Sequence, residues 1–150
     1  FAEQFILWLI RVWVQAHCFE KSSSKLVLDA FARAKVPHGH ARLEEFMTVI
    51  IHSAARDIQI FHPCRCEVNP DEKMLLHILN KLQNRPSYDL ASDLEGFLAP
   101  SGIRIAVDAA GALSHALLDS GIQFSDLEGW KIQSKEQGVH HSMYVSNFIH

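Results

Sequence analysis

The residues with the most evident capacity for chemistry lie in a short segment near position 64. This segment places His62, Cys64 and Cys66 close together. Imidazole and thiolate groups are good zinc ligands, and a structural zinc site takes four ligands in a tetrahedral arrangement. Because the segment supplies three, a zinc site would need a fourth ligand from elsewhere, for which the candidates are Cys18, His17 and His77. Zinc is therefore a candidate cofactor, although the segment alone does not complete a site.

Two other interpretations of this segment remain open. Reactive thiols need a lowered pKa, which Arg65 and the start of a following helix would favour and which Glu67 would oppose. A disulfide between cysteines separated by one residue would be strained and easily reduced, so it would suit a redox switch better than a structural bridge. Alternatively, the segment is a loop whose sulfur atoms have no chemical role. The incomplete ligand set and the lack of Cys-x-x-Cys knuckles favour this last interpretation.

A turn near residue 39 contains two more candidate metal ligands, His38 and His40. Together with His140 and His141 they would provide four imidazoles for a divalent ion. Histidines in a turn that also contains Gly and Pro are more often solvated than metal-bound, so solvation is the favoured interpretation.

Two acid–histidine pairs have the i, i+4 spacing that brings side chains together on a helix. They are His115 with Asp119, and Glu136 with His140. Either pair would be able to transfer a proton or to supply half of a ligand set. Surface pairing is the simpler interpretation, and Gly138 weakens the helix that the second pair requires.

The sequence lacks the motifs that identify several common classes of enzyme. It contains no P-loop, dinucleotide-binding fingerprint, nucleophile elbow or H-E-x-x-H helix, so catalytic residues are not identified and an enzyme is not favoured. Residues 25–51 have the layout of a helix-turn-helix unit, but the second helix carries Glu44 and Glu45 and the net charge is −3. Binding to nucleic acid is therefore not expected.

The composition is that of an ordinary globular protein. Of the 150 residues, 48% are hydrophobic and 21% are charged, which suits one domain with a substantial core. Three cysteines cannot all pair within one chain, and no secretion signal is evident, so a cytoplasmic location is expected. The longest apolar run, residues 5–10, is too short to span a bilayer.

The elements that must position these side chains are helices. Hydrophobic periodicity, with breaks at Pro and Gly, predicts six of them, at about residues 2–19, 25–35, 41–57, 70–83, 87–98 and 103–120. Short connections predict that neighbouring helices are antiparallel. The expected fold is therefore a single-domain all-α bundle over residues 2–121, followed by an irregular tail at residues 122–150. A short strand or a swapped arm is the alternative for the tail.

Two of these helices have the strongest signals. In the helix at 41–57, apolar residues recur at i, i+3, i+4, i+7, i+8 and i+11 from Leu43 to Ala54, which predicts one buried face. The helix that follows the His62–Cys66 segment has the clearest start. Asn69 is placed to cap it, Pro70 suits its first position, and Glu72 can close a capping box.

The first helix is apolar on nearly every side. A helix without a polar face is either central to a core or shared with a partner, and both interpretations remain open. In a dimer the contact would be made by Phe5, Trp8, Leu9 and Trp13, because aromatic residues are enriched at interfaces. A third interpretation is that Arg11 and the two tryptophans lie at the headgroup level of a membrane surface.

The expected function is a binding, interaction or regulatory module that acts as a homodimer. One alternative is a metal- or thiol-dependent protein that uses His62, Cys64 and Cys66, and another is a protein that lies on a membrane surface. The sequence identifies no small-molecule ligand.

Overall fold

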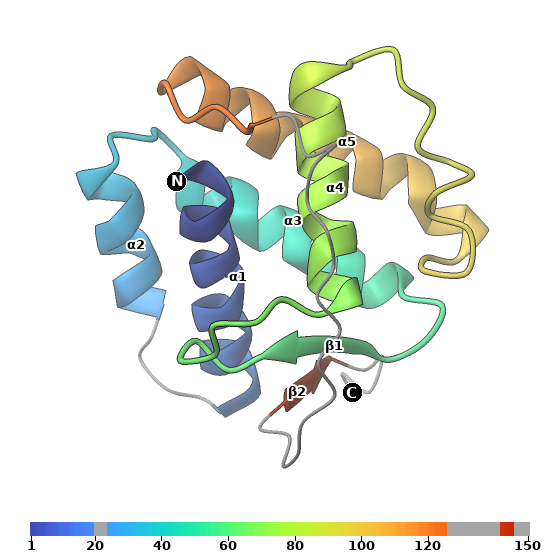
Figure 1. Ribbon diagram of the computed structural model, residues 1–150, viewed down its shortest axis with the longest axis horizontal. Helices are drawn as coiled ribbons and strands as arrows, with labels where there is room; N and C mark the ends of the chain where they lie inside the picture. The colour runs from blue at the N-terminus through green and yellow to red at the C-terminus, as the bar shows by residue number, and fades with distance from the viewer. Residues whose placement is uncertain (20–23, 126–141, 146–150) are drawn as a thin grey trace.

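The computed structural model describes residues 1–19, 24–125 and 142–145 of the chain (Figure 1). Its elements are α1 (Ala2–Phe19), α2 (Ser24–Arg33), α3 (Gly39–Ser53), β1 (Ile58–Phe61), α4 (Pro70–Asn84), α5 (Pro100–Asp119) and β2 (Ser142–Val145). The protein is mostly helical, as its hydrophobic periodicity predicts. Over the described residues it has five helices rather than the six expected.

The central pairing of the fold is between α3 and α5, and α4 packs on α5 beside it. Helix α1 contacts α2, α3, α4 and both strands. The strands pair antiparallel, with Ile58 opposite Val145 and Phe61 opposite Ser142. Figure 1 shows this two-stranded sheet below α1 and α4. Part of the expected irregular tail is therefore a short strand.

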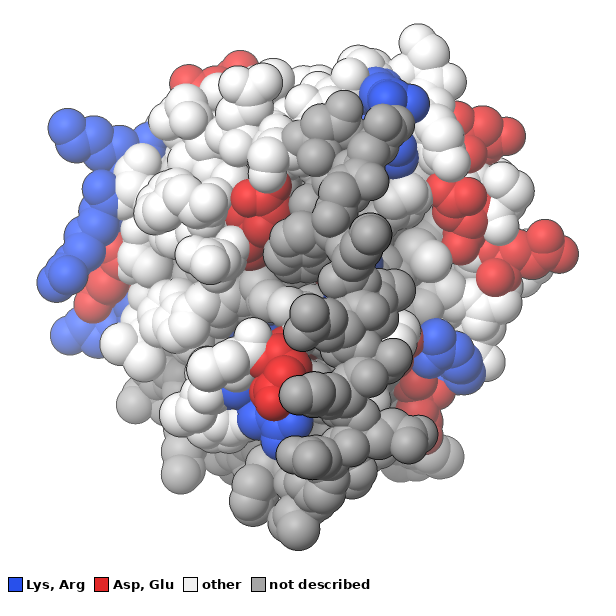
Figure 2. Space-filling model, in the orientation of Figure 1, with Lys and Arg blue, Asp and Glu red and all other residues white. Residues whose placement is uncertain are grey.

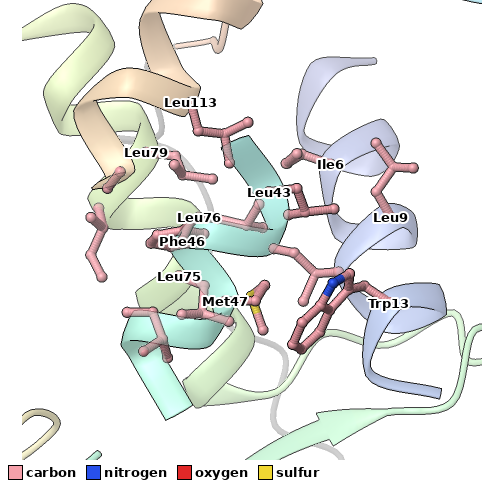
Figure 3. Packing of buried hydrophobic residues seen from close by; sticks show 14 of the residues in the cluster. Ile6, Leu9, Trp13, Leu43, Phe46, Met47, Leu75, Leu76, Leu79 and Leu113 are labelled. Carbon is pink, nitrogen blue, oxygen red and sulfur yellow. The ribbon is translucent and has the colours of Figure 1, made fainter. Parts of the chain in front are cut away.

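The core lies where α1, α3, α4 and α5 meet (Figure 3). The periodic face predicted for α3 is buried, and apolar side chains from the other helices close over it. The buried residues drawn there include Ile6, Leu9, Trp13, Leu43, Phe46, Met47, Leu75, Leu76, Leu79 and Leu113. Burial of each large apolar side chain contributes roughly 1.5–3 kcal/mol, so this cluster is the main source of stability.

The helix expected at residues 87–98 does not form, and this prediction is wrong. Its apolar residues are buried as expected, but turns and isolated bridges carry them into the core instead. Asp89 accepts a hydrogen bond from the backbone of Ala91 at 3.0 Å, which offers the chain an alternative to helical bonding. Gly96 has a φ of 79°, a left-handed conformation that a helix cannot contain. The apolar residues in question are Leu90, Leu94, Phe97 and Leu98.

The same segment shortens α3, which was expected to reach residue 57. The helix ends at Ser53 and the next residue has an extended backbone. The backbone groups here form hydrogen bonds with residues 97–99 instead of continuing the helix. The amide of Ala55 donates to the carbonyl of Phe97 at 3.1 Å, and that of Ala99 donates to Ser53 at 2.6 Å. Loop 85–99 and the end of α3 thus satisfy each other's backbone groups.

The first residues after α5 are fixed by three amide side chains on α4, those of Asn80, Gln83 and Asn84. Gln83 donates to the carbonyls of Ser114 and Ile122 at 3.2 and 3.1 Å, and it accepts from the amide of Phe124 at 2.6 Å. Asn80 donates to the carbonyl of Ser125 at 2.6 Å. Residues 122–125, expected to begin an irregular tail, are therefore bonded to the helices.

Candidate functional site

A buried ion pair anchors the segment that holds His62, Cys64 and Cys66. The guanidinium of Arg11 meets the carboxylate of Glu72 in two parallel bonds, Nε to Oε1 and Nη2 to Oε2, both 2.8 Å long. Arg11 is 4% exposed and Glu72 is fully buried. Such a bidentate pair gives geometric precision as well as energy. It joins the middle of α1 to the first turn of α4.

Glu72 also completes the start of α4. Its carboxylate accepts from the backbone amides of Phe61 at 2.9 Å and Asn69 at 3.1 Å. In return, the Asn69 side chain accepts from the amide of Glu72 at 2.9 Å. The predicted capping box is therefore confirmed, and Pro70 opens the helix as expected. The buried carboxylate is saturated with donors, which is the condition for a charge to lie in a core.

Arg11 uses its remaining donors on the loop itself. Nη1 donates to the carbonyl of Arg65 and Nη2 to the carbonyl of Glu67, both at 2.6 Å. One buried guanidinium thus fixes the backbone on both sides of Cys66. The sequence analysis missed this role for Arg11. The signal was a single charge within the apolar residues 5–14, because a charge that cannot reach water needs a partner within the fold.

The two cysteines of the loop point to the surface. Cys64 and Cys66 are exposed and free, and the amide of Cys64 donates to Nδ1 of His62 at 3.3 Å. Arg65, expected to favour thiolates, instead pairs with Glu67 at 3.1 Å and lies over the Phe61 ring at 4.8 Å. The hydrogen bond from Arg65 and its positive charge help lower the pKa of Glu67, after the larger effect of that residue's own backbone amide.

The structure does not gather four zinc ligands around this loop. His77 is engaged elsewhere, with its Nε2 2.8 Å from Asp93, and His17 stacks on Trp13 at 4.8 Å between ring centroids. Cys18 is exposed at the end of α1, and partial desolvation raises the pKa of its thiol. Within the described ranges, no group of three or more His, Cys, Asp or Glu residues is placed to hold a metal ion.

The contact between His77 and Asp93 forms a small polar cluster with Tyr88, which the sequence analysis did not find. The hydrogen bond with His77 is the largest cause of the lowered pKa of Asp93, and a hydrogen bond from Tyr88 adds to it. The same carboxylate raises the pKa of Tyr88. The two rings meet edge to face at 6.2 Å. His77 and Asp93 are 16 positions apart, and no local sequence pattern indicates that they pair.

His38 and His40, which were expected to act together as metal ligands, have different neighbours in the structure. Nδ1 of His40 lies 3.8 Å from Glu44 on its own helix. His38 instead lines the same surface groove as His115 and Asp119. The predicted pair of Glu136 with His140, and the two histidines His140 and His141 that would join His38 and His40, lie outside the described residues.

A second groove, of about 390 Å³, lies between α1 and the loop. One wall is formed by Leu7 and Trp8, and the other by Pro63, Cys66 and Val68. Arg11 also lines it, so the residue that fixes the loop contributes to the shape of this groove. A preformed hollow with an aromatic wall is a common form of binding site.

Glu3 closes one end of the same groove. Its carboxylate accepts hydrogen bonds from both the amide and the hydroxyl of Ser125, at 2.7 and 2.5 Å. Burial alone would raise the pKa of Glu3, but these bonds outweigh it and the pKa is lowered. The carboxylate is therefore held ionised and directed at the chain beyond α5.

Two of the four residues expected at a dimer contact lie in the core of the chain itself. Leu9 is fully buried and Trp13 is 7% exposed, because α2, α3, α4 and the sheet surround α1. Phe5 is half-buried and Trp8 is 38% exposed. The helix is thus mainly a central core helix, with an aromatic surface at its N-terminal half.

In comparisons with known proteins, no family model, curated sequence or solved structure matches this chain. No helix in the described part of the chain is long and apolar enough to cross a membrane.

Proposed function

We propose that this protein is a binding or interaction module that forms a homodimer through an aromatic stripe on α1. The aromatic stripe consists of Phe1, Phe5 and Trp8, which follow one another at i, i+4 and i+7 and so share one side of the helix. The observation that carries the proposal is the exposure of Phe1 and Trp8 beside a helix whose other large apolar side chains are mostly buried. Phe1 is 86% exposed and Trp8 38%.

The contacts of the stripe support an organised surface. Phe1 stacks on Phe5 at 5.9 Å, and Phe5 meets Phe31 of α2 edge to face at 6.0 Å. At its other end the stripe reaches the groove beside the loop, where Trp8 forms a wall. Figure 2 shows that the face carrying α1 includes a broad uncharged area between charged side chains. Exposed aromatic residues next to a rigid groove are typical of the anchors of protein interfaces.

A second copy of the chain fits such a surface because a two-fold dimer brings the same patch against itself. Each stripe would then cover the other, which removes both sets of aromatic side chains from water. A single domain over residues 1–150 is also proposed, supported by the continuous cluster of buried residues that links all five helices.

The dimer is tested by substituting Trp8→Gln and measuring association by sedimentation velocity up to high micromolar concentration. We expect dimerisation at least roughly tenfold weaker than in the unsubstituted protein, since a central aromatic anchor carries much of the binding energy. Ile105→Gln is the matched control, because Ile105 is 59% exposed on α5, away from the stripe. A clean monomer before any substitution would refute the dimer. Monomers that sediment with liposomes would favour a membrane-surface protein instead.

A second candidate function is thiol chemistry at Cys64 and Cys66. The specific observation is that both sulfur-bearing residues are exposed on a loop whose backbone Arg11 holds in place. A fixed, accessible thiol pair suits reversible oxidation or capture of a soft metal such as zinc. A reducing, cytoplasmic environment is proposed with it, supported by the three free cysteines.

Thiol chemistry is tested by measuring alkylation rates at each cysteine by mass spectrometry, together with the zinc content of protein purified without chelator. Cys64 and Cys66 should react faster than Cys18, because the raised pKa of Cys18 leaves less thiolate at neutral pH. Equal rates at all three positions would remove the case for special reactivity. If Cys64 and Cys66 resist alkylation until zinc is removed, a zinc-dependent function of the loop would be favoured.

A further inference from the structure

The surface groove that contains His38 and His115 lies on a different part of the molecule from the aromatic stripe. It has a volume of about 530 Å³ and is formed by the turn between α2 and α3, the first turn of α3 and the C-terminal half of α5. Figure 1 shows the end of α5 lying beside that turn. Small-molecule sites commonly have volumes between about 300 and 1,000 Å³. The groove is thus large enough for a small ligand.

The charges around this groove are unbalanced. Four basic side chains line it, Lys35, His38, Arg42 and His115, against one acidic side chain, Asp119. Lys35 and Arg42 are permanently charged at neutral pH, and the two imidazoles add charge when protonated. In a chain with a net charge of −3, this is a local reversal of sign.

These basic groups are only weakly engaged within the protein. Arg42 has a long contact of 3.5 Å with Glu45, an exposed pair of the kind that contributes little. Nδ1 of His115 lies 2.7 Å from the carbonyl of Gly111, which leaves its Nε2 for another partner. Their hydrogen-bonding capacity is therefore available to a ligand.

The turn that presents Lys35 and His38 is held in one shape. Both residues have left-handed backbones, with φ of 55° and 59°. Backbone bonds from Val36 to Phe31 at 3.0 Å and from Gly39 to Val36 at 3.2 Å fix it. A Cβ atom at Gly39 would overlap the Phe31 ring, so glycine is required for this close packing. The basic groups are thus carried on a rigid support.

Small apolar side chains line the groove among the charged and polar ones. Ala112 and Ala116 of α5 present small side chains, and Pro37 faces the groove from the turn. The start of α3 has no side-chain cap, so its first amides add partial positive charge close to His38. Basic side chains beside small apolar ones suit an anionic group attached to a compact body.

We propose that this groove binds a small anion through a phosphate or carboxylate group, with Lys35 and Arg42 as its principal cationic contacts. Arg provides planar donors that match either group, and Lys provides a point charge. Asp119 limits the affinity because it places a negative charge at the same site. This site is independent of the aromatic stripe and of the loop thiols.

The test is a two-dimensional amide NMR titration with inorganic phosphate, acetate and sodium chloride at matched ionic strength. We expect saturable shifts from phosphate or acetate, confined to residues around 35–42 and 112–120, and no saturable shifts from chloride. The anion that saturates at the lower concentration identifies the preferred group. Shifts that do not saturate, or that chloride reproduces, would overturn the proposal.

Two double variants distinguish anion binding in this groove from a general effect of positive charge on the protein. Lys35→Gln with Arg42→Gln should weaken binding by about tenfold or more, since hydrogen bonds to charged groups are lost. Arg33→Gln with Arg104→Gln removes the same charge from exposed positions outside the groove and should leave binding unchanged. Equal weakening in both double variants would overturn the proposal.

Asp119→Asn supplies an opposite prediction. Removing the one acidic side chain of the groove should strengthen anion binding several-fold, because it removes a repulsive charge. An unchanged or weaker affinity in this variant would overturn the proposal, since Asp119 would then not face the bound anion. Retained dispersion of the amide spectrum verifies that each variant is folded.

Discussion

Two loops are attached to α4 by a side-chain pair that contains a carboxylate, and the pairs differ in burial. Loop 62–69 is attached by Arg11 and Glu72, which are almost fully removed from water. Loop 85–99 is attached by His77 and Asp93, whose side chains are 34% and 26% exposed. The first pair also satisfies four backbone groups, whereas the second gains a further hydrogen bond from the Tyr88 side chain.

The difference in burial determines how much each pair contributes to the stability of the fold. A buried pair carries a large cost if one partner is lost, because the remaining charge is left without water or counterion. A half-exposed pair can replace its partner with solvent, so its loss costs little. We infer that the first loop depends on its ion pair, and that the second depends on the apolar residues it contributes to the core.

The largest expected effect comes from breaking the buried pair. Arg11→Ala should lower the free energy of unfolding by about 3–5 kcal/mol, because it leaves the Glu72 carboxylate buried and unpaired. Urea denaturation measures this directly. Hydrogen exchange should also quicken at the amides of Phe61 and Asn69, which donate to Glu72.

The matched control for this substitution is Arg104→Ala, which removes an exposed arginine from α5 and should change stability by less than about 0.5 kcal/mol. If Arg11→Ala were as mild as this control, the ion pair would not be what holds the first loop.

A somewhat smaller effect is expected from the apolar anchor of the second loop. Leu94 is fully buried, and Leu94→Ala should cost about 2–5 kcal/mol through lost burial and the cavity left behind. Leu118→Ala is the control, since Leu118 is 38% exposed and its truncation should cost much less. Equal denaturation midpoints for the two variants would mean that loop 85–99 is not anchored by its apolar residues.

Sequence reasoning was reliable where one local pattern determines the outcome. The periodic face from Leu43 to Ile51 and the capping box of Asn69 and Glu72 both appear as predicted. Each depends on residues within a few turns of one helix, so spacing is sufficient to reveal it. The overall helical character follows from the same kind of pattern.

The same reasoning failed where distant residues decide. Residues 87–98 have helical spacing, but the left-handed Gly96 and the pairing of Ala54 with Leu98 impose turns. The bonds from Arg11 to loop 62–69 span more than fifty positions, and no local pattern indicates them. The groove beside His38 likewise combines a turn with a helix whose groove-lining residues begin at Ala112.

The smallest expected effect is at the half-exposed pair, and it depends on pH. The pKa of Asp93 is lowered from its ordinary 3.8, chiefly by the hydrogen bond with His77. A carboxyl with a lower pKa in the folded state stabilises the fold only while it is ionised. Its contribution is therefore present above about pH 4 and is lost as the pH falls further. Asp93→Asn should cost less than about 1 kcal/mol at neutral pH, because the pair is partly solvated.

The pH dependence distinguishes this pair from a packing effect. The difference in unfolding free energy between Asp93→Asn and the unsubstituted protein should shrink as the pH is lowered from 7 towards 3, since protonation of Asp93 then removes the same charge that the substitution removes. Urea denaturation at several pH values measures the difference, and Asp108→Asn, at an exposed position on α5, controls for general charge effects. A difference that stays constant across this range would mean that Asp93 acts through shape rather than charge, so that the second loop, unlike the first, uses no electrostatic anchor at all.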